Sequence, residues 1–270
     1  MNRFIALILS SVLWFAALPA SAESPFITLA STTSTENSGL FAYLLPRFKA
    51  LTGISVRVVA VGTGAALRLG QRGDADALLV HARNAEMKFV AAGHGVERRD
   101  VMFNDFVVIG PASDPAGLRG GHDIVAALRK IASTRARFLS RGDDSGTHKA
   151  ERRHWKSAGI DPTPDSGKWY LETGAGMGAT LNVAAAKSGY TLTDRATWLA
   201  FGNRAGLAIV VEGDPKLRNP YGVIMVNPAK HPHVKRRLVM KFINWITSPK
   251  GRQTIASFRI QGRQVFFPAP

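Results

Sequence analysis

The chain contains no cysteine among its 270 residues. This absence excludes disulfide bonds, thiolate zinc sites, iron–sulfur clusters and a cysteine nucleophile. It also excludes the lipid-modified cysteine that would tether an exported bacterial protein to a membrane. Cysteine-based redox chemistry, metal binding and anchoring are therefore ruled out before any motif is considered.

Long apolar runs are also scarce, and the one such run opens the chain. Met1-Asn2-Arg3 gives a positive start, Phe4 to Leu18 is apolar apart from two serines, and Ala20-Ser21-Ala22 has the small-residue pattern of a signal peptidase site. At about 15 residues, the run is shorter than the roughly 20 that span a bilayer. We therefore expect residues 1–22 to be a signal peptide cleaved after Ala22. The mature protein should then be free in the periplasm, without a lipid anchor.

Acidic residues are few, because 19 Asp and Glu stand against 35 Lys and Arg and the formal net charge is +16. Such an excess of positive charge is expected in a protein that binds either nucleic acid or a small anion. The basic clusters at Arg98-Arg99, Arg152-Arg153 and Lys235-Arg236-Arg237 are short, scattered and poor in interleaved aromatic residues, unlike a nucleic-acid groove. Together with the expected export, this argues against nucleic acid as a partner and favours a small anion.

Apolar β-rich runs alternate with helical patterns through most of the mature chain. Strands are expected at 26–30, 54–61, 77–80, 106–109, 137–140, 208–211 and 221–226, and helices at 36–51, 65–71, 88–92, 123–131, 149–157, 178–186, 234–246 and 251–258. This alternation predicts an α/β fold of parallel βαβ units, with a sheet covered on both faces by helices.

Two hinge-linked α/β lobes fit this length better than one oversized sheet, and no internal repeat or low-complexity linker is present. We expect the strands at 106–109 and 221–226 to cross between the lobes. Lobe 1 then takes residues 23–108 plus 221–270 and is discontinuous, and lobe 2 takes residues 109–220. A chain that crosses twice is suited to hinge closure around a ligand.

Three loops at strand-to-helix junctions are rich in hydrogen-bond donors. They are Ser31 to Glu36 (STTSTE), Val61 to Gly64 (VGTG) and Arg141 to His148 (RGDDSGTH). In the first, Thr33 with Glu36 fits a capping box and predicts a helix N-terminus. Unpaired backbone N–H groups and the positive end of the helix dipole make such junctions suitable for an anion.

The third loop is the most informative. Arg141 can give a forked pair of charge-assisted hydrogen bonds to an oxyanion, Ser145 and Thr147 add hydroxyl donors, and Gly146 exposes backbone N–H groups. Singly, the loops could be a helix cap, a simple turn and an Arg–Asp surface turn. Together they predict an oxyanion site beyond the carboxyl ends of the strands.

Enzymatic and metal-binding alternatives have less support. Ser145 and His148 are close, but no acid that would orient the histidine is identifiable, so a secreted hydrolase ranks low. His231-Pro232-His233 lacks a ligand set at a recognised spacing, and neither a G-x-G-x-x-G fingerprint nor a P-loop occurs. We expect no catalysis, no resident metal and no cofactor.

Segments along nearly all of the mature chain resemble the Tup-type tungstate-binding periplasmic proteins, which are substrate-binding components of ABC transporters. They are STTSTENSGL at 31–40, VGTG at 61–64, GDADALLVHA at 73–82, RGDDSGTHK at 141–149, GMGATL at 176–181, YTLTDR at 190–195, NPYGVI at 219–224 and FINWITSPKG at 242–251. The resemblance implies a two-lobe type II periplasmic-binding fold, with tungstate, or less readily molybdate, in the interlobe cleft. It also implies a monomer that delivers the anion to a membrane permease and its ATPase.

The family's binding residues can be carried over to positions in this chain. They fall on Thr32, Thr33, Ser34, Thr63, Arg141, Ser145, Gly146 and Thr147. Ser31 stands where a threonine is common in the family, and Asn37 where an aspartate is common, so the choice among the hydroxyls of the first loop stays open.

Phosphate is the main alternative ligand, because phosphate-binding proteins carry a loop similar to RGDDSGTH. Phosphate keeps a proton near neutral pH and can donate it to a carboxylate, whereas tungstate only accepts hydrogen bonds. Asp143 or Asp144 directed into the site would favour phosphate. Carboxylates turned towards Arg141 or the backbone would favour tungstate.

Overall fold

The computed structural model describes residues 24–270, so the expected signal peptide and its cleavage site lie outside the described residues. The helices are α1 (Thr33–Asn37), α2 (Leu40–Thr52), α3 (Thr63–Arg72), α4 (Arg83–Ala91), α5 (Ile124–Thr134), α6 (Gly146–Ser157), α7 (Met177–Lys187), α8 (Arg195–Ala200), α9 (Arg236–Thr247) and α10 (Pro249–Ser257), with 3₁₀ turns η1 (Thr163–Asp165) and η2 (Pro215–Leu217). The strands are β1 (Phe26–Thr32), β2 (Ser55–Val61), β3 (Ala77–Val80), β4 (Gly95–Pro111), β5 (Phe138–Ser140), β6 (Tyr170–Glu172), β7 (Tyr190–Asp194), β8 (Leu207–Val211), β9 (Arg218–Val226), β10 (Arg259–Ile260), β11 (Arg263–Gln264) and β12 (Phe267–Pro268). Within these residues, no helix has both the length and the apolar character that a membrane span requires.

One long mixed sheet runs through the molecule in the order β2-β1-β3-β9-β4-β7-β5-β6, with β8 and β12 also paired to β4. The outer strands are parallel, β1 with β2 and β3 at one end and β5 with β6 and β7 at the other. The central pairs of β9 with β3 and β4, and of β4 with β7, are antiparallel. The expectation of parallel units is therefore correct for the outer strands and wrong for the centre.

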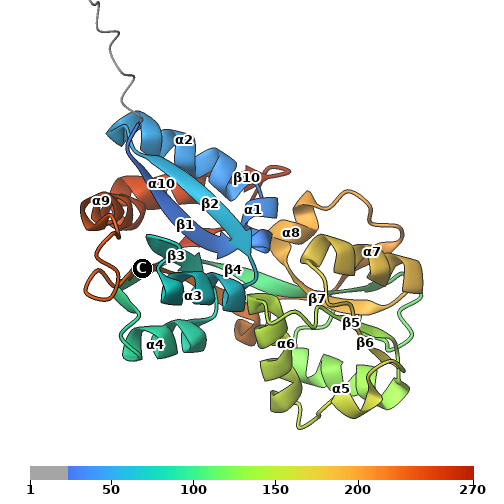
Figure 1. Ribbon diagram of the computed structural model, residues 1–270. Helices are drawn as coiled ribbons and strands as arrows, with labels where there is room; N and C mark the ends of the chain where they lie inside the picture. Colours follow the sequence, from blue (N-terminus) through green and yellow to red (C-terminus); the bar gives the residue numbers. More distant parts are fainter. Residues whose placement is uncertain (1–23) are drawn as a thin grey trace, which may run out of the picture.

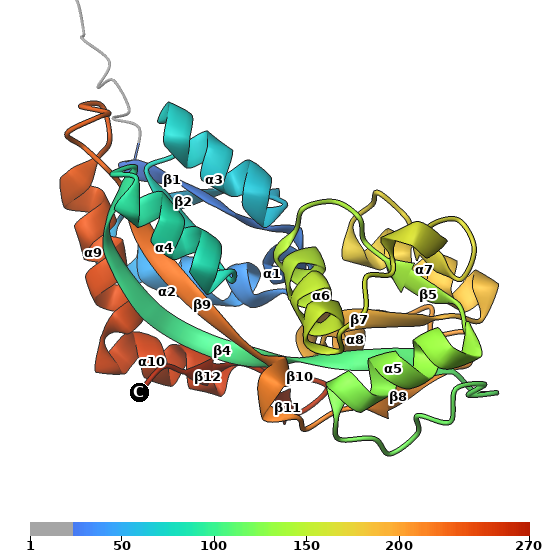
Figure 2. The same cartoon turned by 90° about the horizontal axis from the view of Figure 1, so that it is seen from below.

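Strand β4 joins the two ends of this sheet. It is 17 residues long, pairs with β9 up to Asp105 and pairs with β7 from Phe106 onwards. Figure 2 shows it as one curved ribbon passing from beneath α4 to α5. We call β2, β1, β3, β9 and β4 up to Asp105 the first half of the sheet. The second half is β4 from Phe106 with β7, β5, β6 and β8.

The buried apolar residues form two clusters, and each half of the sheet has its own covering helices. The larger cluster fills the first half and continues into the second through Val107, Ile109, Leu139 and Leu181, and the smaller cluster lies within the second half. In the first half, α2, α9 and α10 lie on one face and α3 and α4 on the other (Figures 1 and 2). Helix α9 shows why such helices form, because its buried residues Val239, Phe242, Ile243 and Ile246 recur at the spacing of one helix face. In the second half, Trp155, Phe138 and Tyr170 pack together at the centre of the core.

The predicted fold class, an α/β sheet covered by helices, is confirmed, and several boundaries needed correction. The helix expected at 36–51 is two helices, because Gly39 has φ of +80° and separates α1 from α2. The strand expected at 106–109 is the last part of β4. Strands β6 and β7 and helix α8 were not anticipated. The lobe boundaries at residues 108 and 220 stay a prediction.

Candidate functional site

The three donor-rich loops meet at the carboxyl ends of β1, β2 and β5. A Cβ atom built on Gly146 would lie 2.9 Å from Thr63 Oγ1, and one built on Gly62 would lie 3.6 Å from the Asp143 carbonyl oxygen. The second loop, from the first half of the sheet, thus contacts the third loop, from the second half. The first loop reaches them through His81, which follows β3. Ser34 Oγ lies 3.3 Å from His81 Nε2, and a Cβ atom built on Gly146 of the third loop would lie 2.6 Å from His81 Cε1.

Buried donors without a partner are concentrated at this meeting point. Among the described residues, eight buried side-chain nitrogen or oxygen atoms have no hydrogen-bond partner, and four of them lie in these three loops. These four are Thr33 Oγ1, Thr63 Oγ1, Thr147 Oγ1 and Arg141 Nε. Buried polar groups in folded proteins are almost always paired. Four unpaired donors from three converging loops therefore indicate a site for a ligand that accepts hydrogen bonds.

Helix N-termini add backbone donors to the same place. Helices α1, α3 and α6 begin at Thr33, Thr63 and Gly146. Their first N–H groups and the positive ends of their dipoles favour an anion. The expected helix start in the first loop is correct, but the Thr33–Glu36 capping box is wrong. The cap is Thr32, whose side chain accepts from Thr35 N, and this leaves the Thr33 hydroxyl without a protein partner.

The other hydroxyls of the first loop have protein partners. Ser31 Oγ donates to the Leu79 carbonyl at 2.6 Å. Thr32 Oγ1 lies 2.7 Å from Thr35 Oγ1 and 3.1 Å from Ser34 Oγ. Of the predicted ligands in this loop, only Thr33 is unpaired.

The third loop contains one capping side chain and one unpaired hydroxyl. Ser145 accepts from His148 N and caps α6, whereas the neighbouring Thr147 hydroxyl is unpaired. Gly146 is the first residue of α6, and its hydrogen in place of a side chain permits the close approach to Thr63.

Both aspartates of this loop are paired within the protein. Arg141 Nη2 donates to Asp143 Oδ2 at 2.5 Å, and Ser145 N donates to Asp143 Oδ1 at 3.2 Å. Asp144 pairs with Lys149 and lies 3.8 Å from Arg68 Nη1. Both carboxylates thus have partners within the protein, which is the arrangement expected for tungstate rather than phosphate.

A buried carboxylate anchors the start of the third loop. Glu151 on α6 accepts from Ser140 Oγ and Tyr170 OH, each at 2.7 Å, and from Trp155 Nε1 at 3.2 Å. Ser140 Oγ in turn accepts from Gly142 N, so this cluster brackets Arg141. Burial raises the pKa of Glu151 to about 7, although its three donors act in the opposite direction.

The raised pKa predicts a pH-dependent stability. Between the ordinary glutamate pKa and about 7, the folded protein holds a proton that the unfolded chain releases, so stability should fall as pH rises through this window. The difference corresponds to about 3 kcal/mol. Thermal unfolding at pH 5 and pH 8 should show this loss in the wild type and a much smaller one in Glu151→Gln. Glu97 is exposed and pairs with Arg99, so Glu97→Gln should behave as the wild type. An unchanged pH response in Glu151→Gln would contradict the assignment.

His81 also belongs to the site and was not singled out as a ligand-site residue. It follows β3, is fully buried among its neighbours and stacks on Tyr221 with ring centroids 4.8 Å apart. A Cβ atom on Gly146 would lie 2.6 Å from His81 Cε1, so the ring also contacts the start of α6. Its position at the carboxyl end of a strand, inside GDADALLVHA, is the signal that could have found it. Burial lowers the pKa of His81 to about 4, and the nearby charge of Arg141 acts in the same direction.

The residues of the rival interpretations have structural partners. His148 Nδ1 accepts from Asp144 N, and Ser145 caps α6, so the two side chains do not form a nucleophile and base pair. His231 Nε2 lies 3.1 Å from the Gln71 carbonyl oxygen, and His233 Nε2 lies 2.8 Å from the Gly73 carbonyl oxygen. In the part of the chain that the structure describes, no group of three or more His, Asp or Glu side chains is placed to hold a metal ion.

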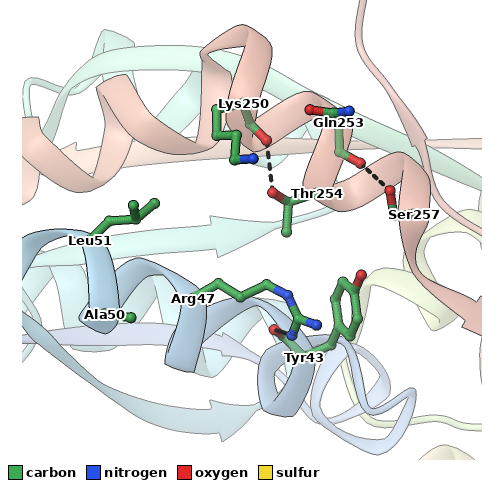
Figure 3. A pocket seen from close by; sticks show the side chains of 8 residues that line it. All are labelled: Tyr43, Arg47, Ala50, Leu51, Lys250, Gln253, Thr254 and Ser257. Carbon is green, nitrogen blue, oxygen red and sulfur yellow. Dashed lines mark hydrogen bonds between the residues drawn. The ribbon is translucent and has the colours of Figure 1, made fainter.

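Two hollows are lined by residues other than Thr33, Thr63, Arg141 and Thr147. A groove of about 440 Å³ separates α2 from α10 (Figure 3). Arg47 lies over the Tyr43 ring there, and the Thr254 and Ser257 hydroxyls donate to carbonyl oxygens of their own helix. A cleft of about 630 Å³ adjoins His81 and Asn219 and is strongly basic. Its charged lining residues are Arg83, Lys149, Arg152, Arg153, Lys156 and Arg218.

Known proteins share this sequence and this architecture. The model of the PBP superfamily domain matches residues 19–250. The tungstate-binding protein TupA of Peptoclostridium acidaminophilum is 50% identical over 234 residues, which are 86% of this chain and 81% of that protein. The chain belongs to the Tup-type tungstate-binding protein family.

Solved structures of this family have the same fold. The tungstate-binding protein TupA from Desulfovibrio alaskensis G20 has a TM-score of 0.77 at 50% identity, over 91% of this chain and 99% of that chain. The tungstate ABC transporter structure from Geobacter sulfurreducens has a TM-score of 0.79 at 49% identity, over 86% of this chain and 98% of that chain. The resemblance that the sequence motifs indicated is confirmed.

Proposed function

We propose that this protein is the substrate-binding component of an ABC transporter and captures tungstate, or molybdate, between the two halves of its sheet. The observation that carries the proposal is the group of four buried, unpaired donors from three converging loops. Membership of the Tup-type family supports the same ligand class.

The hydrogen-bond donors and acceptors of the site support tungstate over phosphate. Tungstate accepts hydrogen bonds at all its oxygens and donates none. The site offers hydroxyl and N–H donors, whereas Asp143 and Asp144 are paired with Arg141, Lys149 and the backbone. Hydrogen bonds to a charged group contribute roughly 1.5–3 kcal/mol each, so several together can exceed the costs of association.

The proposal includes the setting in which the protein works. After cleavage behind Ala22, it acts as a periplasmic monomer and delivers the anion to a membrane permease driven by an ATPase. The lobes are residues 23–108 with 221–270, and residues 109–220. The eight residues predicted as ligands all lie in the three converging loops, and no cofactor takes part. They are Thr32, Thr33, Ser34, Thr63, Arg141, Ser145, Gly146 and Thr147. Thr33, Thr63, Arg141 and Thr147 are the four with an unpaired side-chain donor, and we propose these as the side chains that bind the anion.

Calorimetric titration of the mature protein with tungstate, molybdate, sulfate and phosphate tests this function. We expect tight binding of tungstate and molybdate and weak or no binding of the other two. Tight phosphate binding without a tungstate response would overturn the proposal. An enzymatic role is tested alongside, because a binding protein should gain thermal stability from the oxyanion without turning over ester or phosphate substrates.

The basic cleft beside His81 should speed the arrival of the anion. Arg153 and Lys156 line it, are exposed and form no ion pair with any described residue. Reversing both to glutamate should lower the association rate several-fold at low salt, since a local field of one sign raises the encounter rate.

The matched control for this prediction reverses Arg237 and Lys241, which are exposed on α9 and change the net charge equally. Stopped-flow fluorescence should show a normal association rate for that control. The dissociation rate should stay unchanged in both variants, and the difference should disappear at about 0.5 M salt because screening shortens the range of the field. Equal slowing in the two variants would assign the effect to net charge rather than to the cleft.

A further inference from the structure

We propose that His81 is a positioning residue that accepts the hydrogen bond of the Ser34 hydroxyl. Thr33 is then the residue of the first loop whose hydroxyl binds the oxyanion. The inference rests on the proposed function and goes beyond it. It says which donors face the ligand and what fixes their direction.

Asp194, the N-cap of α8, fixes which groups donate and which accept in a chain of hydrogen bonds that leads to His81. Its carboxylate accepts from Thr197 N at 2.9 Å and from Thr197 Oγ1 at 2.6 Å. Asn104 therefore turns its Nδ2 group towards Asp194, at 3.3 Å from Oδ1. Its Oδ1 atom then faces Asn219 and accepts from Asn219 Nδ2 at 2.7 Å.

This orientation of Asn219 sets the tautomer of His81. With its amide nitrogen on Asn104, Asn219 presents Oδ1 to His81 Nδ1 at 3.1 Å. A carbonyl oxygen can only accept, so His81 carries its proton on Nδ1. The ring is neutral near pH 7 because burial and Arg141 lower its pKa to about 4. Nε2 is therefore unprotonated and accepts a hydrogen bond from the Ser34 hydroxyl, whose Oγ lies 3.3 Å away.

A hydroxyl has one proton, so this bond removes Ser34 from the donors available to an anion. Ser31 is removed in the same way by the Leu79 carbonyl, and Thr32 serves as the cap of α1 and bonds within the loop. Thr33 Oγ1 alone in this run is buried without a partner. The five consecutive hydroxyl residues Ser31–Thr35 thus supply one side-chain donor to the ligand, while the other four shape the loop.

The chain of bonds crosses the junction of the two sheet halves. Asn104 and Asn219 face each other in the β4–β9 register, one residue pair from the end of that pairing, and Asp194 ends β7 in the second half. His81 follows β3 in the first half and touches Gly146 of α6. The ring is thereby held against both halves at the place where they meet.

Nitrogen-15 NMR of the ligand-free protein tests the tautomer. Long-range correlations of the His81 ring should show a proton on Nδ1 and an unprotonated Nε2 at pH 7. A proton on Nε2 would overturn the inference. This readout requires no ligand, so it is independent of whether the protein binds tungstate.

Tungstate titrations of two hydroxyl variants test the division of roles. Thr33→Val keeps the side-chain shape and should weaken binding at least ten-fold, whereas Ser34→Ala should weaken it less than three-fold. If both variants lose affinity equally, Ser34 is a ligand and the inference is wrong. If the wild type itself fails to bind tungstate, the proposed function fails instead.

Two replacements of His81 complete the test. Gln can donate to Asn219 and accept from Ser34, so His81→Gln should keep affinity within about three-fold. His81→Phe keeps a ring but removes the acceptor, which frees the Ser34 proton for the ligand. In the Phe background, Ser34→Ala should cost several-fold more affinity than it does in the wild type. An equal cost in both backgrounds would contradict the proposed contact.

Discussion

Replacing Arg141 with alanine is expected to weaken tungstate binding about 30-fold or more. Arg141 is 3% exposed, its Nε is unpaired, and it carries the fixed positive charge among the candidate donors. Loss of a charge-assisted hydrogen bond in a buried site corresponds to about 2 kcal/mol, which is the 30-fold change. Calorimetric titration measures the effect directly.

Two further variants separate this effect from a general loss of charge. Arg72→Ala removes an exposed arginine that pairs with Asp74 and should leave affinity unchanged. Arg141→Lys keeps the charge but loses the planar fork, and should give an intermediate affinity. Unchanged affinity in Arg141→Ala would remove Arg141 from the site.

Replacing Gly146 with alanine is expected to reduce tungstate affinity at least ten-fold by keeping the loops apart. The added Cβ would lie 2.6 Å from His81 Cε1 and 2.9 Å from Thr63 Oγ1, closer than such atoms approach in folded proteins. Both neighbours are buried and belong to the first half of the sheet, whereas Gly146 starts α6 in the second. The ring and the hydroxyl cannot move without disturbing the site.

The control for this prediction is Gly178→Ala. Gly178 is the second residue of α7, and a Cβ atom there would meet nothing within 4 Å. Small-angle scattering with saturating tungstate should show Gly146→Ala more open than the wild type, and Gly178→Ala unchanged. Equal affinity in the wild type and Gly146→Ala would show that the contact between the second and third loops is not needed for binding.

The sequence was sufficient to predict the α/β class and the three loops, because both depend on local patterns. The apolar run Ala77–Val80 is a fully buried strand, and Arg141, Gly146 and Thr147 lie where a strand-to-helix junction places them. Family resemblance added the ligand class. Thr33 and Thr63, which the sequence predicted as ligands, lie in the loops that converge, and their role in binding stays a prediction.

The direction of each hydroxyl could not be read from sequence, because it depends on partners far along the chain. Ser31 bonds to a residue 48 positions away and Ser34 to one 47 positions away. Local pattern favoured Thr33 as the capping residue, whereas the fold uses Thr32. The full length of β4 was missed for the same reason, since its polar start at Gly95–Asp100 is held in the sheet by β9.

The shared strand β4 also determines how the molecule can move. The chain enters and leaves the second half through neighbouring strands, since Asp105 of β4 lies opposite Arg218 of β9. A bend where β4 passes from β9 to β7 would change the angle between the two halves. Strands β7 and β8 pair with the part of β4 that belongs to the second half, so these pairings can move with that half as a unit. We therefore expect the protein to release its ligand by a change in the angle between the halves, without loss of structure within either half.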